Sequence, residues 1–483
     1  MSARKGGMGR QLVGLARHSA IYGVGGLLAR VLALVLLPLY TRYLTRSDFG
    51  AIGTLIALTA VLSVLLRLGT QSAFFRFYFD SKERAGRLVV VRTAFWFTMA
   101  ASTIGLVLGE IFASEIAQWI FGNTDHTDLV RASFVGLWAQ MNYGQLTSLF
   151  RVEQRSTSYV IASVANVLIT IGATIVLVVV FHEGALGVIV GNFLGTLTVY
   201  FGLLAYRREQ LGLQFDWNLF KRMEHFGLPL LPSALALWAI NFSDRFFLTH
   251  FAGTGETGIY QIGVQISSVI VFLLMAFRLA WPAFAYSIED DSEARRTYPF
   301  VLTYLIFICS WLALALGLLA PWIVELLTTP QFYEGAEVVA LLAFAATAYA
   351  GYAVVVIGVG RVRQTRFNWI VTGTAAALNI GLNVALIPEY GQIGAGIATL
   401  ASYALMFAGM TWNAHRLFPV PYQWRRVVTV GGLAVGLTVL GKVLDVPLGA
   451  AIAIVAAYPL LLALAGFYLP AERRLIRRLL PAR

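Results

Sequence analysis

Residues 225–286 read HFGLPLLPSALALWAINFSDRFFLTHFAGTGETGIYQIGVQISSVIVFLLMAFRLAWPAFAY, and they contain two long apolar segments with charged side chains inside them. Asp244 and Arg245 lie in the first segment and Arg278 lies in the second, whereas most other charges lie near segment ends. A charge in the hydrocarbon of a bilayer is costly, so such residues usually pair across helices or line a wet cavity. This stretch therefore indicates a helical membrane bundle with a polar interior.

The composition of the whole chain agrees with this interpretation. Of the 483 residues, 58% are hydrophobic and only 12% are charged, whereas a soluble domain has about 25% charged residues. The net charge of +12 comes from basic residues scattered in short clusters between apolar segments. Membrane topology explains this pattern better than nucleic-acid binding does. The single Cys309 excludes an intramolecular disulfide and a cysteine metal cluster, and we expect neither a metal nor a cofactor.

The apolar segments predict the number of membrane crossings. A bilayer core requires roughly 20 mostly apolar residues per helix, and on this basis the sequence divides into about fourteen spans. The first is expected over 15–41, as a retained helix and not a cleaved signal peptide, and the second over 49–75. No loop is long enough to form a separate domain. The predicted class is an all-α polytopic membrane protein.

The distribution of Lys and Arg predicts the orientation. With the N-terminus inside, the tails and the even-numbered loops hold 27 of the 36 basic residues, and the opposite loops hold 3. Cytoplasmic loops carry the excess of Lys and Arg. Both termini are therefore predicted to be cytoplasmic.

An internal repeat predicts the architecture. Ser47-Asp48-Phe49-Gly50 matches Gly255-Glu256-Thr257-Gly258 at an offset of about 208 residues, and later matches keep nearly the same offset. Because this offset joins helices that enter from the same side, the two repeats are parallel. We expect two six-helix lobes around a central cavity, at 1–210 and 211–418, and two further helices with a basic tail at 419–483.

Polar residues recur on single faces of several spans. Thr59, Ser63, Arg67 and Gln71 are four residues apart, and Asn241 shares a face with Arg245. Arg30 lies near the middle of the first span, too deep to reach the interface easily. Further polar stripes are expected on the fourth span (Arg131, Trp138, Asn142, Gln145) and the eleventh (Asn379, Asn383). These stripes predict a hydrated cationic cavity.

A structural interpretation of the same residues stays open. An intramembrane arginine can bridge helices through Asp244 or a free carbonyl group, and polar stripes can join helices by hydrogen bonds. Asp244 is expected to point away from Arg245, because consecutive helical residues do not face each other. Arg92 and Arg131 lie close enough to the interfaces to extend into the headgroup layer.

The sequence resembles the bacterial polysaccharide flippases, which move lipid-linked oligosaccharide repeat units. The resemblance rests on Ala29-Arg30-Val31, on Leu39-Tyr40-Thr41-Arg42-Tyr43-Leu44 with Phe49-Gly50, and on Asp244-Arg245-Phe246-Phe247-Leu248 followed by Gly258-Ile259-Tyr260. It covers essentially the whole chain. The superfamily also contains lipid II flippases and multidrug and toxin extruders.

The resemblance implies a function. The chain is expected to be a transporter and not an enzyme, which flips polyprenyl-diphosphate-linked oligosaccharides across the bacterial inner membrane by alternating access. The implied partners are this substrate, membrane lipid and other polysaccharide-assembly proteins. By their helix positions, Arg30, Arg67 and Arg278 are similar to arginines that meet the substrate diphosphate in lipid II flippases. Together with Arg245, Asp244, Gln71 and Asn241 they form the predicted substrate site. A multidrug or metabolite antiporter of the same fold is the alternative.

Overall fold

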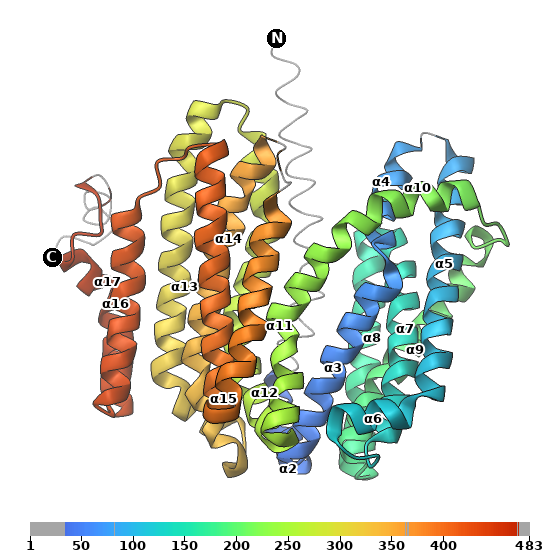
Figure 1. Cartoon of the computed structure of the whole chain (residues 1–483), viewed down its shortest axis with the longest axis horizontal. Helices are drawn as coiled ribbons and strands as arrows, with labels where there is room; N and C mark the ends of the chain where they lie inside the picture. Colours follow the sequence, from blue (N-terminus) through green and yellow to red (C-terminus); the bar gives the residue numbers. More distant parts are fainter. Residues whose placement is uncertain (1–33, 82, 363, 365–366, 471, 473–483) are drawn as a thin grey trace. The chain divides into compact units, whose positions relative to one another are not determined.

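The computed structural model describes residues 34–81, 83–362, 364, 367–470 and 472. Within this part of the chain the secondary structure is helical, without a strand (Figure 1). The helices divide into two compact units: unit 1 comprises Met1–Gln261 and Thr372–Ala395, and unit 2 comprises Ile262–Val371 and Gly396–Arg483. Arg30 lies outside the described residues.

Unit 1 contains most of the N-terminal helices. In chain order these are α2 (Leu37–Tyr43), α3 (Arg46–Arg67), α4 (Thr70–Asp80), α5 (Arg84–Ile111), α6 (Ala113–Phe121), α7 (Thr127–Val152), α8 (Ser156–Ile175) with the π-helical turn η1 (Val176–Val180), α9 (Gly184–Arg207), the short helix η2 (Arg208–Gln210), α10 (Trp217–Gly227), η3 (Leu228–Leu230) and α11 (Leu231–Phe251). α9 packs against α7 and α8, and α11 packs against α3.

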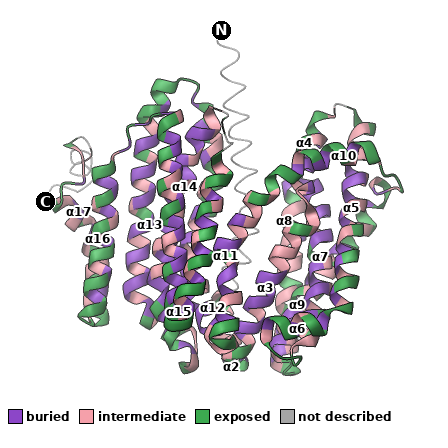
Figure 2. Ribbon diagram, viewed as in Figure 1, coloured by how far each residue is buried: buried purple, intermediate pink, exposed green. Residues whose placement is uncertain are grey.

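The remaining helices follow in chain order. They are α12 (Gly253–Ser287), α13 (Asp291–Leu327), η4 (Pro330–Gly335), α14 (Ala336–Arg361), α15 (Asn368–Leu417), α16 (Trp424–Val443) and α17 (Leu448–Leu464). α15 consists of two helices joined at Gly391, whose φ is 50°. In unit 2, α13 packs against α14, α16 and α17, and buried residues dominate α13 and α14 (Figure 2).

Ten of the described helical segments are long and apolar enough to cross a membrane. α7 has comparable length but carries more polar side chains, and α17 is a shorter apolar helix. The chain is therefore a multi-pass helical membrane protein, and the number of fourteen crossings stays a prediction.

The predicted second span, 49–75, is wrong at its end. α3 begins at a capping box, in which Thr45 and Asp48 bond each other's backbone amides, but it ends at Arg67. Leu68 (φ 46°) and Gly69 (φ 82°) then turn the chain into α4. The ideal Cβ of Gly69 would lie 2.3 Å from the carbonyl oxygen of Gly227, so this turn requires glycine. The apolar pattern hid the break because it continues through Leu68.

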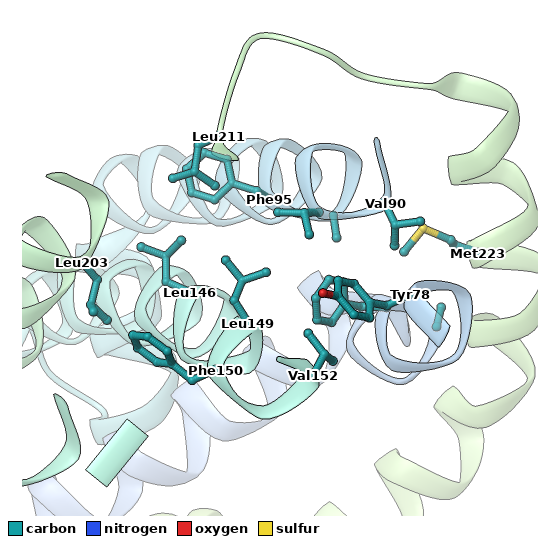
Figure 3. Close-up of a cluster of buried hydrophobic side chains, with 14 of the residues drawn as sticks. Tyr78, Val90, Phe95, Leu146, Leu149, Phe150, Val152, Leu203, Leu211 and Met223 are labelled. Carbon is teal, nitrogen blue, oxygen red and sulfur yellow. The ribbon is translucent and has the colours of Figure 1, made fainter. Parts of the chain in front are cut away.

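One of the buried clusters of unit 1 lies where α4, α5, α7, α9 and α10 meet. Phe74 and Tyr78 of α4, Phe95 of α5, Phe150 of α7 and Met223 of α10 are all buried there. Figure 3 shows Tyr78 next to Val152, the last residue of α7. α10 packs on α4 and α5, and α11 packs on α3, which is why unit 1 extends beyond the predicted lobe boundary at 210. The predicted lobes stay a prediction.

The two motifs that revealed the repeat contact each other inside unit 1. The hydroxyls of Ser47 and Thr254 are 2.8 Å apart. The ideal Cβ of Gly50 would lie 1.8 Å from the Thr254 carbonyl oxygen, and that of Gly258 would lie 1.9 Å from the Arg46 carbonyl oxygen. The N-terminal turns of α3 and α12 therefore touch through backbone atoms.

Candidate functional site

A cavity of about 570 Å³ opens among four helices of unit 1. Its polar lining comes from hydroxyl and amide groups, and no charged side chain lines it within the described part of the chain. These polar residues are Thr59 and Ser63 of α3, Ser133 and Gln140 of α7, and Asn192 and Thr196 of α9. Thr59 and Ser63 of the predicted polar stripe therefore line a cavity, but the described lining is neutral, whereas the stripes predicted a cationic cavity. Apolar walls come from Ile52, Ile56, Leu137, Phe193 and Phe242, among others.

The hydroxyls and amides of this lining differ in what they can offer a ligand. Thr59 bonds the Leu55 carbonyl oxygen at 2.9 Å and Ser133 bonds the Leu129 carbonyl oxygen at 2.8 Å, so helix backbone occupies these hydroxyls. Gln140 and Asn192 are exposed, and their amides make no side-chain hydrogen bond within the described residues. An amide both donates and accepts. The cavity therefore presents bonding groups suited to a neutral, hydroxyl-rich ligand.

Arg67 lies one helical turn beyond Ser63, on the same side of α3. Its Nη1 donates to Oε1 of Gln71 at 2.7 Å, so two predicted site residues are together even though the helix breaks between them. The guanidinium lies against Gly144 of α7, where an ideal Cβ would be 3.1 Å from Nη2. Within the described chain Arg67 forms no ion pair, and its buried Nε has no hydrogen-bond partner.

Asp244 and Arg245, unlike Arg67, form an ion pair with each other. The expectation that Asp244 points away from Arg245 is wrong, because Nη1 of Arg245 lies 2.6 Å from Oδ1 of Asp244. The arginine side chain bends back along α11 and also donates to the Asn241 carbonyl oxygen, while the Tyr260 hydroxyl donates to Oδ2 of Asp244. Both side chains are at least 94% buried. This pair is enclosed by its own partners. The exposed Asn241 amide donates to the Leu237 carbonyl oxygen at 2.6 Å.

The polar stripe predicted on the fourth span lies partly between helices. Asn142, fully buried, donates to the Ser102 hydroxyl of α5 at 2.8 Å, and Trp138 donates to Thr103 at 3.0 Å. These residues join α7 to α5, while Ser133 and Gln140 of the same helix face the cavity. Asn379 and Asn383 are buried and bond Ser243 of α11, which again joins helices.

Arg278 belongs to unit 2 and is exposed there. Its Nη1 donates to the Tyr349 hydroxyl at 2.6 Å, and its guanidinium lies 5.4 Å from the centre of that ring. Among the described residues, no group of three or more His, Cys, Asp or Glu could hold a metal ion.

A comparison with protein families gives the relationship of the chain. The model of the polysaccharide biosynthesis protein family matches residues 39–337. The chain belongs to this family. A relative in Methanocaldococcus jannaschii, an uncharacterized membrane protein, is 22% identical over 439 residues, which cover 84% of this chain and 85% of that protein.

Solved structures agree on the fold of this family member. The lipid II flippase MurJ, in an inward closed conformation, superposes with a TM-score of 0.75 at 13% identity, over 95% of this chain and 100% of that chain. An inward-facing multidrug resistance MATE family transporter of the MOP superfamily gives a TM-score of 0.66 at 13% identity, over 83% of this chain and 94% of that chain. The family member therefore has the fold of MOP-superfamily transporters.

Sequence reasoning missed the cavity residues of α7 and α9 in this family member. Gln140, Asn192 and Thr196 line the cavity but were not predicted as site residues. A signal was present, because Asn192 and Thr196 are four residues apart in an otherwise apolar, glycine-rich helix. Ser133 and Gln140 are likewise seven residues apart, which places them on one face of α7.

Proposed function

We propose that this chain translocates polyprenyl-diphosphate-linked oligosaccharide units from the cytoplasmic to the outer leaflet of a bacterial inner membrane, for cell-surface polysaccharide synthesis. The observation that carries the proposal is the neutral cavity of unit 1, with the Arg67 guanidinium one turn beyond it. Membership of the polysaccharide biosynthesis protein family and the fold shared with a lipid II flippase support it.

The chemistry of the substrate fits these two parts of the site. An oligosaccharide is rich in hydroxyls, so the amides of Gln140 and Asn192 can exchange hydrogen bonds with it in place of water. The diphosphate is anionic, and a guanidinium binds it through two parallel charge-assisted hydrogen bonds. Arg67 suits this role because no carboxylate neutralises it among the described residues. Arg30 and Arg278 are proposed as further diphosphate contacts on the resemblance alone.

The MATE-like fold makes drug extrusion the competing function. A pump for cationic drugs is expected to have an acidic group in its cavity that balances the charge of the drug. Here the cavity has the aromatic Phe193 and Phe242 but no acid among its described lining residues. The composition of the lining thus favours the glycolipid.

The test uses the purified full-length protein in proteoliposomes with a fluorescent polyprenyl-diphosphate oligosaccharide. Arg67→Ala should slow flipping at least about tenfold, because it removes charge-assisted hydrogen bonds, and Arg67→Lys should restore part of the rate. Gln140→Leu combined with Asn192→Leu should slow the glycolipid but not a polyprenyl diphosphate without sugar. Arg131→Ala is the matched control, because Arg131 is exposed and makes only long ion pairs of 3.7 and 3.8 Å.

Two outcomes would contradict the proposal. Flipping at the unchanged rate by Arg67→Ala would remove the diphosphate role of Arg67. Transport of a cationic dye by the unmodified protein, without any flipping of the glycolipid, would favour the drug antiporter instead.

A further inference from the structure

A second pocket of unit 1 lies apart from the cavity and has different chemistry. It consists of two adjoining hollows of about 300 and 600 Å³ that share Tyr78, Arg84, Arg87, Glu153 and Gln210. The walls come from α4 and the start of α5, from the turn after α7, and from η2. All three segments belong to loops that the Lys and Arg distribution assigns to the cytoplasmic side.

Arginine dominates the lining of this pocket. Arg84, Arg87 and Arg155 line it, and Glu153 is the one acid among its described lining residues. Glu153 is already neutralised by Arg207, which is only 3% exposed and whose Nη2 lies 2.8 Å from Oε2 of the glutamate. Because Arg207 does not itself line the pocket, it neutralises Glu153 without being one of the described lining arginines. The three lining arginines therefore leave the pocket with a positive charge.

The surrounding contacts hold the pocket in shape. Arg207 donates to Oε1 of both Glu153 and Gln210 at 3.0 Å and lies over the Phe150 ring at 4.5 Å. Arg87 donates from Nε to the Ser81 carbonyl oxygen at 2.9 Å and lies over the Tyr78 ring at 5.4 Å. These contacts hold four of the five shared residues, and one of the four, Tyr78, also belongs to a buried cluster of unit 1 (Figure 3).

Two arginines of this pocket have N–H groups that remain available to a ligand. Arg84 is exposed and makes no hydrogen bond or ion pair within the described part of the chain. The ion pair of Arg155 is with Glu153, and its Nε lies 3.5 Å from Oε2 of the glutamate. Burial raises the pKa of the Tyr78 phenol, and the Glu153 charge adds to this, against a lowering by Arg87 and Arg207. The Tyr78 hydroxyl thus stays protonated at neutral pH.

We propose that this pocket binds a phosphate group through Arg84, Arg87 and Arg155. Arginine forks match the geometry of phosphate oxygens, and several of them around one pocket favour a group with more than one anionic oxygen. Phe79, which is 56% exposed, forms part of the rim. An apolar rim beside a cationic pocket suits the headgroup of an anionic phospholipid, and a soluble diphosphate shares the same phosphate chemistry.

The test measures binding to the purified full-length protein in detergent. Native mass spectrometry compares phosphatidylglycerol with phosphatidylcholine, and calorimetry measures inorganic pyrophosphate. The double variant Arg84→Gln/Arg155→Gln should lower the affinity for the preferred ligand about tenfold or more. The double variant Arg222→Gln/Arg425→Gln removes the same charge from exposed positions outside the pocket and should change it less than about twofold.

The two arms identify the source of the phosphate. Selective binding of phosphatidylglycerol that the pocket variant loses supports the headgroup, and pyrophosphate binding that the same variant loses supports a soluble ligand. Equal binding of both lipids without pyrophosphate binding overturns the proposal, and so does an equal loss in the control variant. If the double variant unfolds at a lower temperature without ligand, the single Arg155→Gln variant is measured in its place.

Discussion

Two arginines within apolar helices of unit 1 differ in their partners. Arg245 has a carboxylate at 2.6 Å, a carbonyl group and aromatic rings, and it is buried. Arg67 is only partly buried and has one neutral amide partner. A buried ion pair is already neutralised by its own partner, while a cation without an acid is available to an anion. This contrast favours Arg67 over Arg245 as the arginine that meets the proposed substrate.

The Asp244–Arg245 pair carries a prediction about stability. Removing one member of a buried pair leaves the other charge uncompensated, which costs about 3 to 5 kcal/mol. Asp244→Leu should therefore lower the unfolding temperature in detergent strongly. The double variant Asp244→Leu/Arg245→Met should be more stable than the single variant, because it leaves no charge behind. If the double variant is less stable than the single one, the two side chains do not act as a pair.

At the scale of helices, the contact between the first turns of α3 and α12 leaves no room for a side chain. A Cβ added to Gly50 or to Gly258 would meet a backbone carbonyl oxygen of the opposite helix. Asp48 and Glu256, the carboxylates two residues before these glycines, also have similar contacts. Asp48 lies against Gly184 at the start of α9, and Glu256 accepts the backbone amide of Gln392 beside Gly391. Gly184 and Gly391 have φ values of 52° and 50°. Equivalent positions near the 208-residue offset therefore have equivalent geometry.

This contact predicts the effect of a methyl group. Gly50→Ala would place its Cβ 1.8 Å from the Thr254 carbonyl oxygen, so the two helices must separate. A loss of about 1 to 3 kcal/mol of stability is expected, measured as a lower unfolding temperature. Gly431→Ala in α16 is the control, because no described atom outside its own stretch of helix lies within 4 Å of its ideal Cβ. It should be neutral or slightly stabilising. Equal unfolding temperatures for the two variants would show that the contact is not tight.

Hydropathy predicted most helices, and the repeat predicted which two motifs are equivalent, because both depend on local sequence. The sequence did not predict three features of the structure. The αL turn at Leu68 and Gly69 lies within an apolar run, and apolarity alone does not report backbone conformation. The contact of Asp244 with Arg245 depends on a side chain bending back along its own helix. The division of α7 between a face toward α5 and a face toward the cavity depends on its neighbours.

At the scale of the molecule, the compact units do not coincide with the two halves of the sequence. Thr372–Ala395, from the C-terminal half, belongs to unit 1, where Asn379 and Asn383 bond Ser243 of α11. Such a segment must find its place after the rest of unit 1 has been synthesised. Non-local contacts of this kind are governed by tertiary packing, which the periodicity of a single helix does not report.

The distribution of charge gives the final prediction, which concerns topology. The 27 to 3 division of Lys and Arg between the two sets of loops places the α6–α7 loop and η4 outside, and the α12–α13 loop inside. Asn123 and Glu334 are exposed residues of the first two segments, and Glu293 is exposed in the first turn of α13, directly after the α12–α13 loop. In a Cys309→Ser background, Asn123→Cys and Glu334→Cys should react with an impermeant thiol reagent added to intact cells. Glu293→Cys should react only after the membrane is permeabilised. Labelling of Glu293→Cys alone in intact cells would show that the orientation is the reverse of the predicted one. The arginine pocket and Arg67 would then meet their ligands from the opposite side of the membrane.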